Sequence, residues 1–280
     1  MTTLYLIGLG LSDEKDITLK GLEVIKISEK VFLEGYTSIL NIDLAKLEQF
    51  YQKKVTLCFR ETVEIEMDEI LAEIASESNI GKTFSFLVVG DPFCATTHSD
   101  LQLRAIKLGI QVKAIHNASI INAVGVCGMQ LYSFGPIVSI PFFQPKWRPY
   151  SFLDKVGFNF QNNLHTLLLL DIRVKEISDE NLLKGRKIYD EPRFMSVNVA
   201  IEQILEAEKE LKSGKFGQIE DVKAFGVARI GSEDQIIKSG RLRDLLVWDF
   251  GKPLHSMVIC APKLHPIEEE MYEFYRKGGL

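Results

Sequence analysis

The chain has 280 residues and a formal net charge of −5, with 46% hydrophobic and 25% charged residues. This is a globular composition, and the length is enough for about two domains. Binding to nucleic acid is disfavoured, because it requires a basic surface that neutralises phosphates. The longest strongly apolar run, residues 164–172, is interrupted by His165 and Asp171 and is far shorter than the roughly 20 residues of a membrane span.

The N-terminal residues and the cysteines indicate the cellular setting. The start, MTTLYLIGLG, has neither the basic segment nor the cleavage site of a secretory signal peptide. Cys58, Cys94, Cys127 and Cys260 are scattered without a CxxC pair, which is typical of reduced cysteines rather than of a disulfide framework or a zinc site. We therefore expect a cytoplasmic protein that is not bound to a membrane and holds no metal.

The first half of the chain alternates short apolar runs with helical patterns. The predicted strands are residues 4–9, 31–33, 55–59, 84–89 and 112–115, and the predicted helices are 16–30, 41–51, 61–76, 99–108 and 119–129. Strands that alternate with helices form a parallel sheet with helices on both faces. We expect an α/β domain with such a sheet over residues 1–133.

The second half begins near residues 130–136, where a domain boundary is indicated by Gly125, Gly128, Gly135 and Pro136. Its predicted strands are residues 137–140, 164–172, 224–230 and 256–260, and its predicted helices are 152–160, 196–211 and 266–276. We expect a second α/β domain over residues 134–280, with a strand order that the pattern does not determine.

Ligands of open parallel sheets bind beyond the carboxyl ends of the strands, so the residues there are candidates for a site. The first strand ends in Gly8 and Gly10, which allow a sharp turn and a close approach to a ligand. A dinucleotide fingerprint would need a third glycine where Asp13 stands, so an ordinary turn is the better interpretation. Glu34 ends the second strand where a ribose-binding acid would lie. Without the third glycine, we interpret Glu34 as a solvated strand end.

Two further strand ends carry polar residues. Gly90-Asp91-Pro92 follows the fourth strand, and a carboxylate there can accept hydrogen bonds from ribose hydroxyls or pair with an ammonium. The alternative is that Asp91 only forms a turn with its own backbone. The segment 116–120 follows the next strand and places Ser119 at a helix N-terminus, as a ligand contact or as a plain N-cap. These alternatives stay open at this point.

The remaining histidines and the search for common enzyme motifs identify no further candidate site. His165 lies inside an apolar run and is interpreted as a core histidine, whereas His255 stays undecided. The sequence has no Walker loop, no Gly-x-Ser-x-Gly elbow and no zinc-protease motif.

Several segments resemble the diphthine synthases of the tetrapyrrole-methylase superfamily. In the first half these segments are LYLIGLGLSDEKDITLKGLEVI, FLEGYTS, LVVGDPFCATTHSDL and IHNASIINAVGVCGMQLYSFG. In the second half they include KWRPYSFLDKV, LHTLLLLDIRVKE, GRKIYDEPRFMSVNVA, ARIGSEDQII and PLHSMVI. GDPF alone indicates only the superfamily, and the later segments resemble the eukaryotic-type enzymes. The resemblance covers nearly the whole chain.

The resemblance implies a two-domain methyltransferase that uses S-adenosylmethionine, releases S-adenosylhomocysteine and works as a homodimer, with the cofactor in the cleft between the domains. The substrate would be the modified histidine of translation elongation factor 2, on the route to diphthamide. Eukaryotic-type members transfer three methyl groups to an amino nitrogen and one to a carboxylate, giving diphthine methyl ester. There are four alternatives. The chain could transfer three methyl groups only, or it could be a tetrapyrrole-type small-molecule methyltransferase. It could also be a nicotinamide oxidoreductase or a non-catalytic module that binds the elongation factor.

The resemblance also implies a set of cofactor contacts. By motif, these are Leu11, Asp91, Cys94, Ser119, Ile120, Leu170, Ile230 and His255. Diphthine synthases usually have glycine in place of Cys94, so this side chain would have to point away from the ligand. Methyl transfer needs alignment rather than a nucleophilic side chain. We therefore name no catalytic residue and expect Cys94 to be a spectator.

Overall fold

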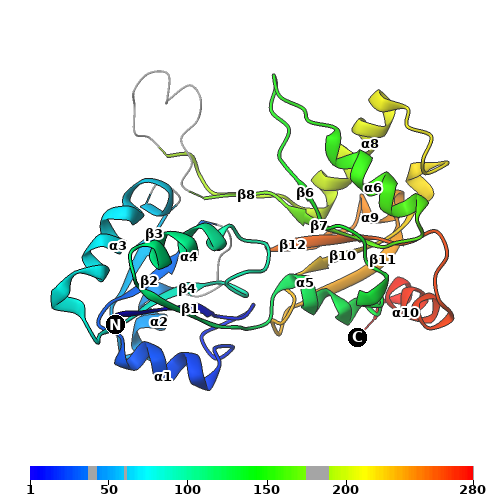
Figure 1. The fold of residues 1–280 in the computed structure, drawn as a ribbon. Helices are drawn as coiled ribbons and strands as arrows, with labels where there is room; N and C mark the ends of the chain where they lie inside the picture. Colours follow the sequence, from blue (N-terminus) through cyan, green and yellow to red (C-terminus); the bar gives the residue numbers. More distant parts are fainter. Residues whose placement is uncertain (37–42, 60–61, 175–188, 280) are drawn as a thin grey trace. The chain divides into compact units, whose positions relative to one another are not determined.

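The structure, a computed structural model, describes residues 1–36, 43–59, 62–174 and 189–279. The chain divides into two compact units (Figure 1). Unit 1 comprises residues 1–121 with the described residues of 174–192, and unit 2 comprises residues 122–173 and 193–280. Within the described ranges, no helix is both long enough and apolar enough to cross a membrane.

Unit 1 is built on a five-stranded sheet in which every pairing is parallel, in the order β3-β2-β4-β1-β5. The strands are β1 (Thr3–Gly8), β2 (Val31–Glu34), β3 (Val55–Cys58), β4 (Thr83–Val88) and β5 (Gln111–Ile115). Each begins and ends within two residues of the range that the sequence predicts. The expected parallel α/β domain is therefore confirmed.

The helices of unit 1 cover both faces of this sheet (Figure 1). They are α1 (Leu19–Ile27), α2 (Leu44–Tyr51), α3 (Met67–Ala75) after a π-helical turn (Thr62–Glu66) and α4 (His98–Lys107), with a 3₁₀ turn at Glu77–Asn79. The short α5 (Ile120–Ala123) begins in unit 1 and ends in unit 2. Neighbouring strand residues point to opposite faces. Leu6 accordingly packs in one apolar cluster with α3 and α4, and Ile7 packs in a second cluster with α1 and α2.

Unit 2 has a mixed five-stranded sheet in the order β11-β10-β12-β7-β6, in which only β6 and β7 are parallel. The strands are β6 (Val138–Ile140), β7 (Thr166–Leu170), β10 (Lys223–Ala228), β11 (Ile236–Arg241) and β12 (His255–Ile259). A separate ladder pairs β8 (Ile172–Arg173) with β9 (Arg193–Phe194). The second α/β domain is confirmed in class.

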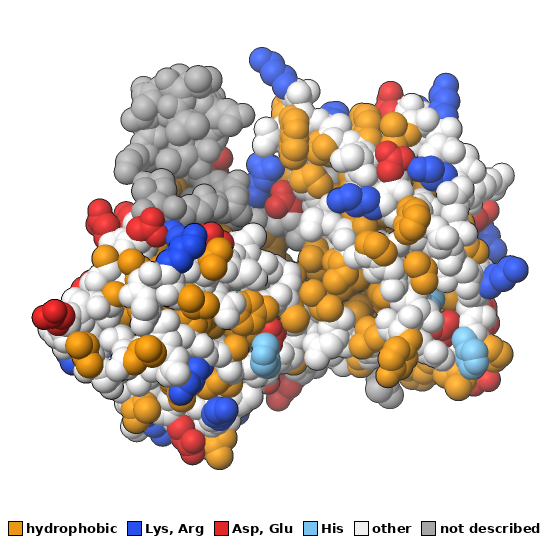
Figure 2. Space-filling model, viewed as in Figure 1, with side chains coloured by type: hydrophobic (Ala, Val, Ile, Leu, Met, Phe, Trp, Pro, Cys, Tyr) orange, Lys and Arg blue, Asp and Glu red, His pale blue; other side chains and the backbone are white. Residues whose placement is uncertain are grey.

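The helices of unit 2 are α6 (Ser151–Gln161), α8 (Val197–Leu211), α9 (Leu242–Leu245) and α10 (Pro266–Lys277). A large apolar cluster on one face of the sheet joins residues of α6, α8 and α9 to Ala224 of β10. The next residue, Phe225, points to the opposite face, where its ring packs against Tyr272 of α10 at a centroid distance of 5.7 Å. On the side drawn in Figure 2, hydrophobic side chains lie among charges of both signs.

The predicted helix at residues 119–129 is wrong beyond Ala123. Two 3₁₀ turns, Val124–Cys127 and Leu131–Ser133, follow α5. Gly128 has a φ of 89°, and a Cβ there would lie 2.5 Å from the Cβ of Met271 in α10. The N–H of Gln130 also donates to Glu268 of that helix. These turns pack on α10 and belong to unit 2, which begins at residue 122.

The strands of unit 2 differ from the sequence prediction at β11, at β9, which was not predicted either, and at residues 164–172. β11 was not predicted, because IIKSGR lacks a clear apolar alternation and is held by pairing with β10. The predicted strand 164–172 is divided into β7 and β8. Asp171 lies between them, and its carboxylate accepts hydrogen bonds from the N–H of Phe142 at 2.9 Å and from Nε of Arg173 at 3.3 Å.

Core packing against Gly226 yields the first prediction. A Cβ at this position of β10 would overlap the ring of Phe250, which is buried in the apolar cluster of unit 2. We expect Gly226→Ala to lower the free energy of unfolding by about 1–3 kcal/mol through overpacking. Urea denaturation measures the change. Gly125→Ala is the control, because its nearest contact would lie at an ordinary 3.5 Å from Leu131. Equal stability of the two variants would contradict this packing.

Candidate functional site

The ends of β1, β4 and β5 meet at the carboxyl edge of the unit 1 sheet. The backbones of Gly10 and Gly90 pair there, with N···O distances of 2.7 and 3.2 Å, and both have a φ of 79°. A Cβ on Gly8 would lie 2.5 Å from the carbonyl oxygen of Gly90 and 2.8 Å from the Cβ of Asn117. Glycine is therefore needed at position 8 because the three strand ends approach so closely.

Asp91 is the buried centre of this edge, with 4% of its surface exposed. Its Oδ1 accepts the N–H of Phe93 at 2.9 Å, and its Oδ2 accepts the N–H of Asn117 at 3.1 Å and the Nδ1–H of His116 at 2.8 Å. Burial acts to raise the pKa of Asp91, but these hydrogen bonds outweigh it and hold the pKa below its ordinary value. Asp91 is thus an ionised carboxylate that forms the expected turn and also ties the end of β4 to the end of β5.

Asn117 and Asp16 fix the loop that follows β1. The side-chain amide of Asn117 donates to the carbonyl oxygens of Gly8 and Asp16, each at 3.0 Å. The Oδ2 of Asp16 in turn accepts the N–H groups of Leu11 at 3.1 Å and Ser12 at 2.8 Å. Asn117 belongs to the segment 116–120 that the sequence places at this edge, but its bonds to Gly8 and Asp16 were not predicted, and Asp16 was not predicted to take part. A polar pair directly after β5 was the only local signal for Asn117.

The predicted contacts Cys94, Ser119 and Ile120 lie at the same edge. Ser119 is buried, and its Oγ accepts the N–H of Ile121 at 3.2 Å, so a cap-type bond is present. Burial, followed by the Asp91 charge, raises the pKa of the Cys94 thiol, which lies beside Asp91 and Ser119. The thiol therefore lies toward the other predicted contacts, whereas the resemblance required it to point away from a ligand among them.

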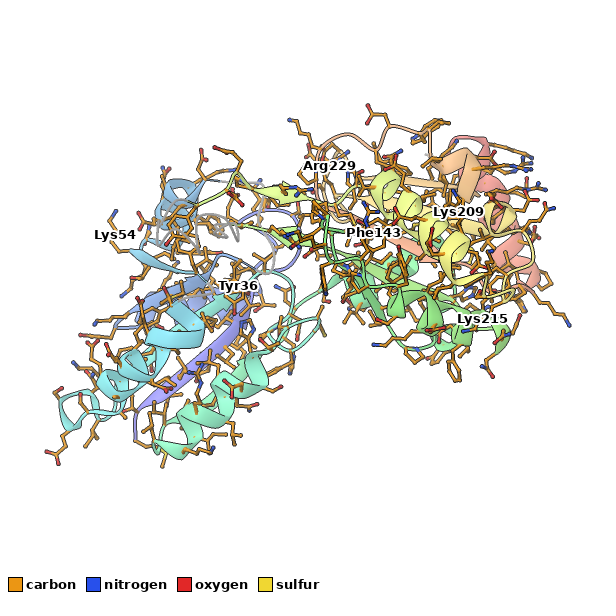
Figure 3. All side chains as sticks on the ribbon, turned by 90° about the horizontal axis from the view of Figure 1, so that it is seen from above. Tyr36, Lys54, Phe143, Lys209, Lys215 and Arg229 are labelled. Carbon is orange, nitrogen blue, oxygen red and sulfur yellow. The ribbon has the colours of Figure 1, made fainter. Side chains whose placement is uncertain are left out.

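The interpretation of Glu34 as a solvated strand end is wrong, because its side chain is buried. Its Oε2 lies 3.7 Å from Nε2 of His98, the first residue of α4. The other ring nitrogen of His98 donates to the carbonyl oxygen of Pro92 at 3.1 Å. All four residues of β2 are buried, and Tyr36 beyond them is buried too (Figure 3). Glu34 and His98 thus support the loop of Asp91 and Pro92 from within the unit.

The predicted contacts of unit 2 gather at one end of its own sheet. His255 pairs with Ala228 across the β10–β12 ladder, and the adjacent Ser256 pairs with Leu169 of β7. Leu170 and Ile230, one and two residues beyond these partners, therefore lie at the same sheet end as His255. Both are largely buried.

Side-chain hydrogen bonds hold the loops at the unit 2 sheet end. Arg229, labelled in Figure 3, donates from Nε to Asp234 at 2.7 Å and from a terminal nitrogen to the Phe250 carbonyl at 3.0 Å. The ring of His255 donates from Nε2 to the Lys252 carbonyl at 2.8 Å and accepts the N–H of Val197 at Nδ1. Burial is the main cause that lowers the pKa of His255, so its ring is neutral at pH 7.

The interpretation of His165 as a core histidine is confirmed. Its ring is fully buried and accepts the N–H of Ala261 at Nδ1, 3.0 Å away. The other nitrogen therefore carries the hydrogen and donates to Glu268 at 3.1 Å. Elsewhere too, the described residues include no cluster of three or more His, Cys, Asp or Glu side chains able to hold a metal ion.

Comparison with known proteins gives one consistent result. Residues 3–246 match the family model of tetrapyrrole (corrin/porphyrin) methylases. The chain is 54% identical over 274 residues to the diphthine methyl ester synthase of Homo sapiens, covering 97% of this chain and 94% of the relative. It is 52% identical over 275 residues to that of Dictyostelium discoideum, covering 98% of each. A crystal structure of a diphthine synthase superposes with a TM-score of 0.82 at 32% identity, covering 99% of this chain and 96% of that one.

The hydrogen bonds of Asp91 make its contribution to stability pH-dependent. Because the pKa of Asp91 in the folded protein is below its ordinary 3.8, the stabilisation is present above pH 3.8 and is lost as the pH falls through the lower folded value. We expect Asp91→Ala to lower the free energy of unfolding by about 1–3 kcal/mol at pH 7, since buried donors lose their acceptor.

Urea titrations of wild type and Asp91→Ala across pH 2–7 measure this difference. Glu23→Ala, which removes an exposed carboxylate of α1, is the control and should show no comparable loss. A difference between Asp91→Ala and wild type that grows toward low pH would contradict the assignment.

Proposed function

The chain belongs to the tetrapyrrole methylase family and, within it, to the diphthine methyl ester synthases, and we propose that it methylates elongation factor 2. The methyl donor is S-adenosylmethionine, and the product S-adenosylhomocysteine is released. The acceptor is the modified histidine of the elongation factor in diphthamide biosynthesis. The observation that carries this proposal is the similarity to named diphthine methyl ester synthases over 97% of the chain.

The edge of unit 1 fits a small polar organic cofactor. A Cβ at Gly90 would lie 3.8 Å from the Cα and Cβ of Ser119, an ordinary van der Waals distance, so Gly90 and Ser119 are close neighbours at this edge. A carboxylate offers about four acceptor positions, and Asp91 uses three of them on Phe93, His116 and Asn117. The remaining position, which the weakly donating Cys94 thiol faces, can accept a ribose hydroxyl or an ammonium.

We propose the complete set of predicted residues as cofactor contacts. In unit 1 these are Leu11, Asp91, Cys94, Ser119 and Ile120, and in unit 2 they are Leu170, Ile230 and His255. The cofactor supplies the reacting methyl group on a sulfonium. The protein's part is to align that methyl with the acceptor, a form of catalysis that can lower a barrier by about 7–11 kcal/mol when the geometry is good.

We further propose four transfers, three to the amino nitrogen and one to a carboxylate oxygen. The support is the words "methyl ester" in the names of the relatives, which require a transfer to a carboxylate. A homodimer in the cytoplasm is part of the same proposal and rests on the family resemblance alone.

Mass spectrometry of the product tests the function. The purified protein is incubated with S-adenosylmethionine and elongation factor 2 that carries the unmethylated precursor. We expect a gain of four methyl groups, one of which is removed by mild base. A gain of three without a base-labile group would mean trimethylation only, and no gain would overturn the proposal. Separately, S-adenosylhomocysteine should raise the melting temperature and NAD should not.

Cys94 offers a sharper test of the cofactor edge. We expect Cys94→Gly to keep methyl transfer and to bind S-adenosylhomocysteine at least as tightly, because it frees the acceptor position of Asp91 that the thiol faces. Calorimetry measures the affinity and product mass measures the transfer. Cys58→Ala, at the buried end of β3, is the cysteine control. Normal binding by Cys94→Gly without transfer would refute the spectator role of this thiol.

A further inference from the structure

The Asp91–His116 pair joins a buried carboxylate to an exposed imidazole. Asp91 is 5% exposed and His116 is 70% exposed at the side chain, and Oδ2 lies 2.8 Å from Nδ1. Because an ionised carboxylate can only accept, Nδ1 must carry the hydrogen of this bond. The neutral ring then has its lone pair on Nε2, to which no described residue hydrogen-bonds.

This ring is held in place although it is exposed. The ring of Phe93 lies beside it, with centroids 6.2 Å apart, and the N–H of Phe93 binds the same carboxylate. The backbone N–H of Asn117 binds the Oδ2 atom that His116 uses. The carboxylate therefore fixes both the tautomer and the direction of the imidazole, and it stabilises the imidazolium that forms when Nε2 takes a proton. A carboxylate does the same for the base of a Ser-His-Asp triad.

The proposed reaction requires a proton acceptor at some of its steps and not at others. Aliphatic amines are largely protonated near pH 7, and an ammonium has no lone pair with which to attack. Each of the first two transfers also leaves an alkylammonium that must lose a proton before the next. A carboxylate is already ionised at pH 7, so the transfer to oxygen releases no proton.

We propose that Nε2 of His116 is the general base for methyl transfer to the amine, with Asp91 as its positioning residue. This inference rests on the proposed function. Nε2 takes a proton from the substrate ammonium, which frees the nitrogen lone pair. That pair forms the bond to the methyl carbon while the carbon–sulfur bond breaks and its electrons stay on sulfur. The imidazolium returns its proton to water before the next transfer.

Three other titratable groups at this edge, Asp91, Cys94 and Asp16, are less suited than His116 to accept a proton from the substrate. Asp91 is ionised and accepts three hydrogen bonds, and the raised pKa of Cys94 keeps that thiol neutral. Asp16 accepts the side-chain N–H of Asn117 at its carbonyl oxygen, and its carboxylate accepts the N–H groups of Leu11 and Ser12. Histidine is also the side-chain type best suited to accept and release protons near neutral pH.

The test is His116→Asn, because the asparagine amide can still donate to Asp91 from the place of Nδ1 but has no basic nitrogen. We expect transfer to the amine to fall about 100-fold or more, the usual contribution of a general base. Transfer to the carboxylate of a substrate that is already trimethylated should be retained, and so should binding of S-adenosylhomocysteine. His265→Asn is the matched control, since it replaces an exposed histidine that caps α10 by another capping residue.

Two further readouts separate a base from a structural residue. The loss of methyl transfer to the amine in His116→Asn should become smaller as the pH rises, because water then deprotonates the amine. Added imidazole should restore part of the activity of His116→Ala. Equal losses of transfer to nitrogen and to oxygen, or full transfer to nitrogen by His116→Asn, would overturn the inference while leaving the proposed function intact. A wild-type protein that methylates neither atom would overturn both.

Discussion

The carboxylate of Asp91 ties the loops after β4 and β5 together at the place where three parallel strands end. It is buried and ionised, and each of its oxygens accepts at least one hydrogen bond from the protein. The N–H of Asn117 that it binds belongs to the residue whose side chain also holds the carbonyl oxygens of Gly8 and Asp16. The direction of the His116 ring follows from this ionised group. The loop of Leu11 is linked to it through Asn117 and Asp16.

The two units build their sheet ends by different means. In unit 1, glycines let the main chains approach closely, and the carboxylate of Asp91 accepts hydrogen bonds from N–H groups of the loops. In unit 2, the long side chain of Arg229 reaches the carbonyl of Phe250, while the ring of His255 links Lys252 to the start of α8. Backbone contacts suit close approach to a ligand, whereas in unit 2 side-chain hydrogen bonds hold loops that contain Gly231 and Gly251.

Local sequence patterns predicted most of the fold and part of the candidate site. The apolar runs predicted every strand of unit 1, and the Gly-Asp-Pro turn after β4 placed Asp91 at the sheet edge. Errors arose where distant residues decide the outcome. The helix from 119 stops early because Met271 and Glu268 of α10 meet the turns around Gly128. Glu34 is buried because His98 of α4 lies against it. Asp16 and His116 gained their roles only when the fold brought them to Leu11 and Asp91.

The close contact at Gly8 has a consequence for how this edge tolerates change. The atoms that a side chain at position 8 would strike are a main-chain oxygen and a β-carbon, and neither can rotate away. A single added methyl group would therefore push apart three strand ends at once. A side chain such as that of Cys94 alters only what faces the edge. Side chains in the loops of this edge can therefore change in chemical type, whereas Gly8, which has no room for a side chain, preserves the shape of the edge.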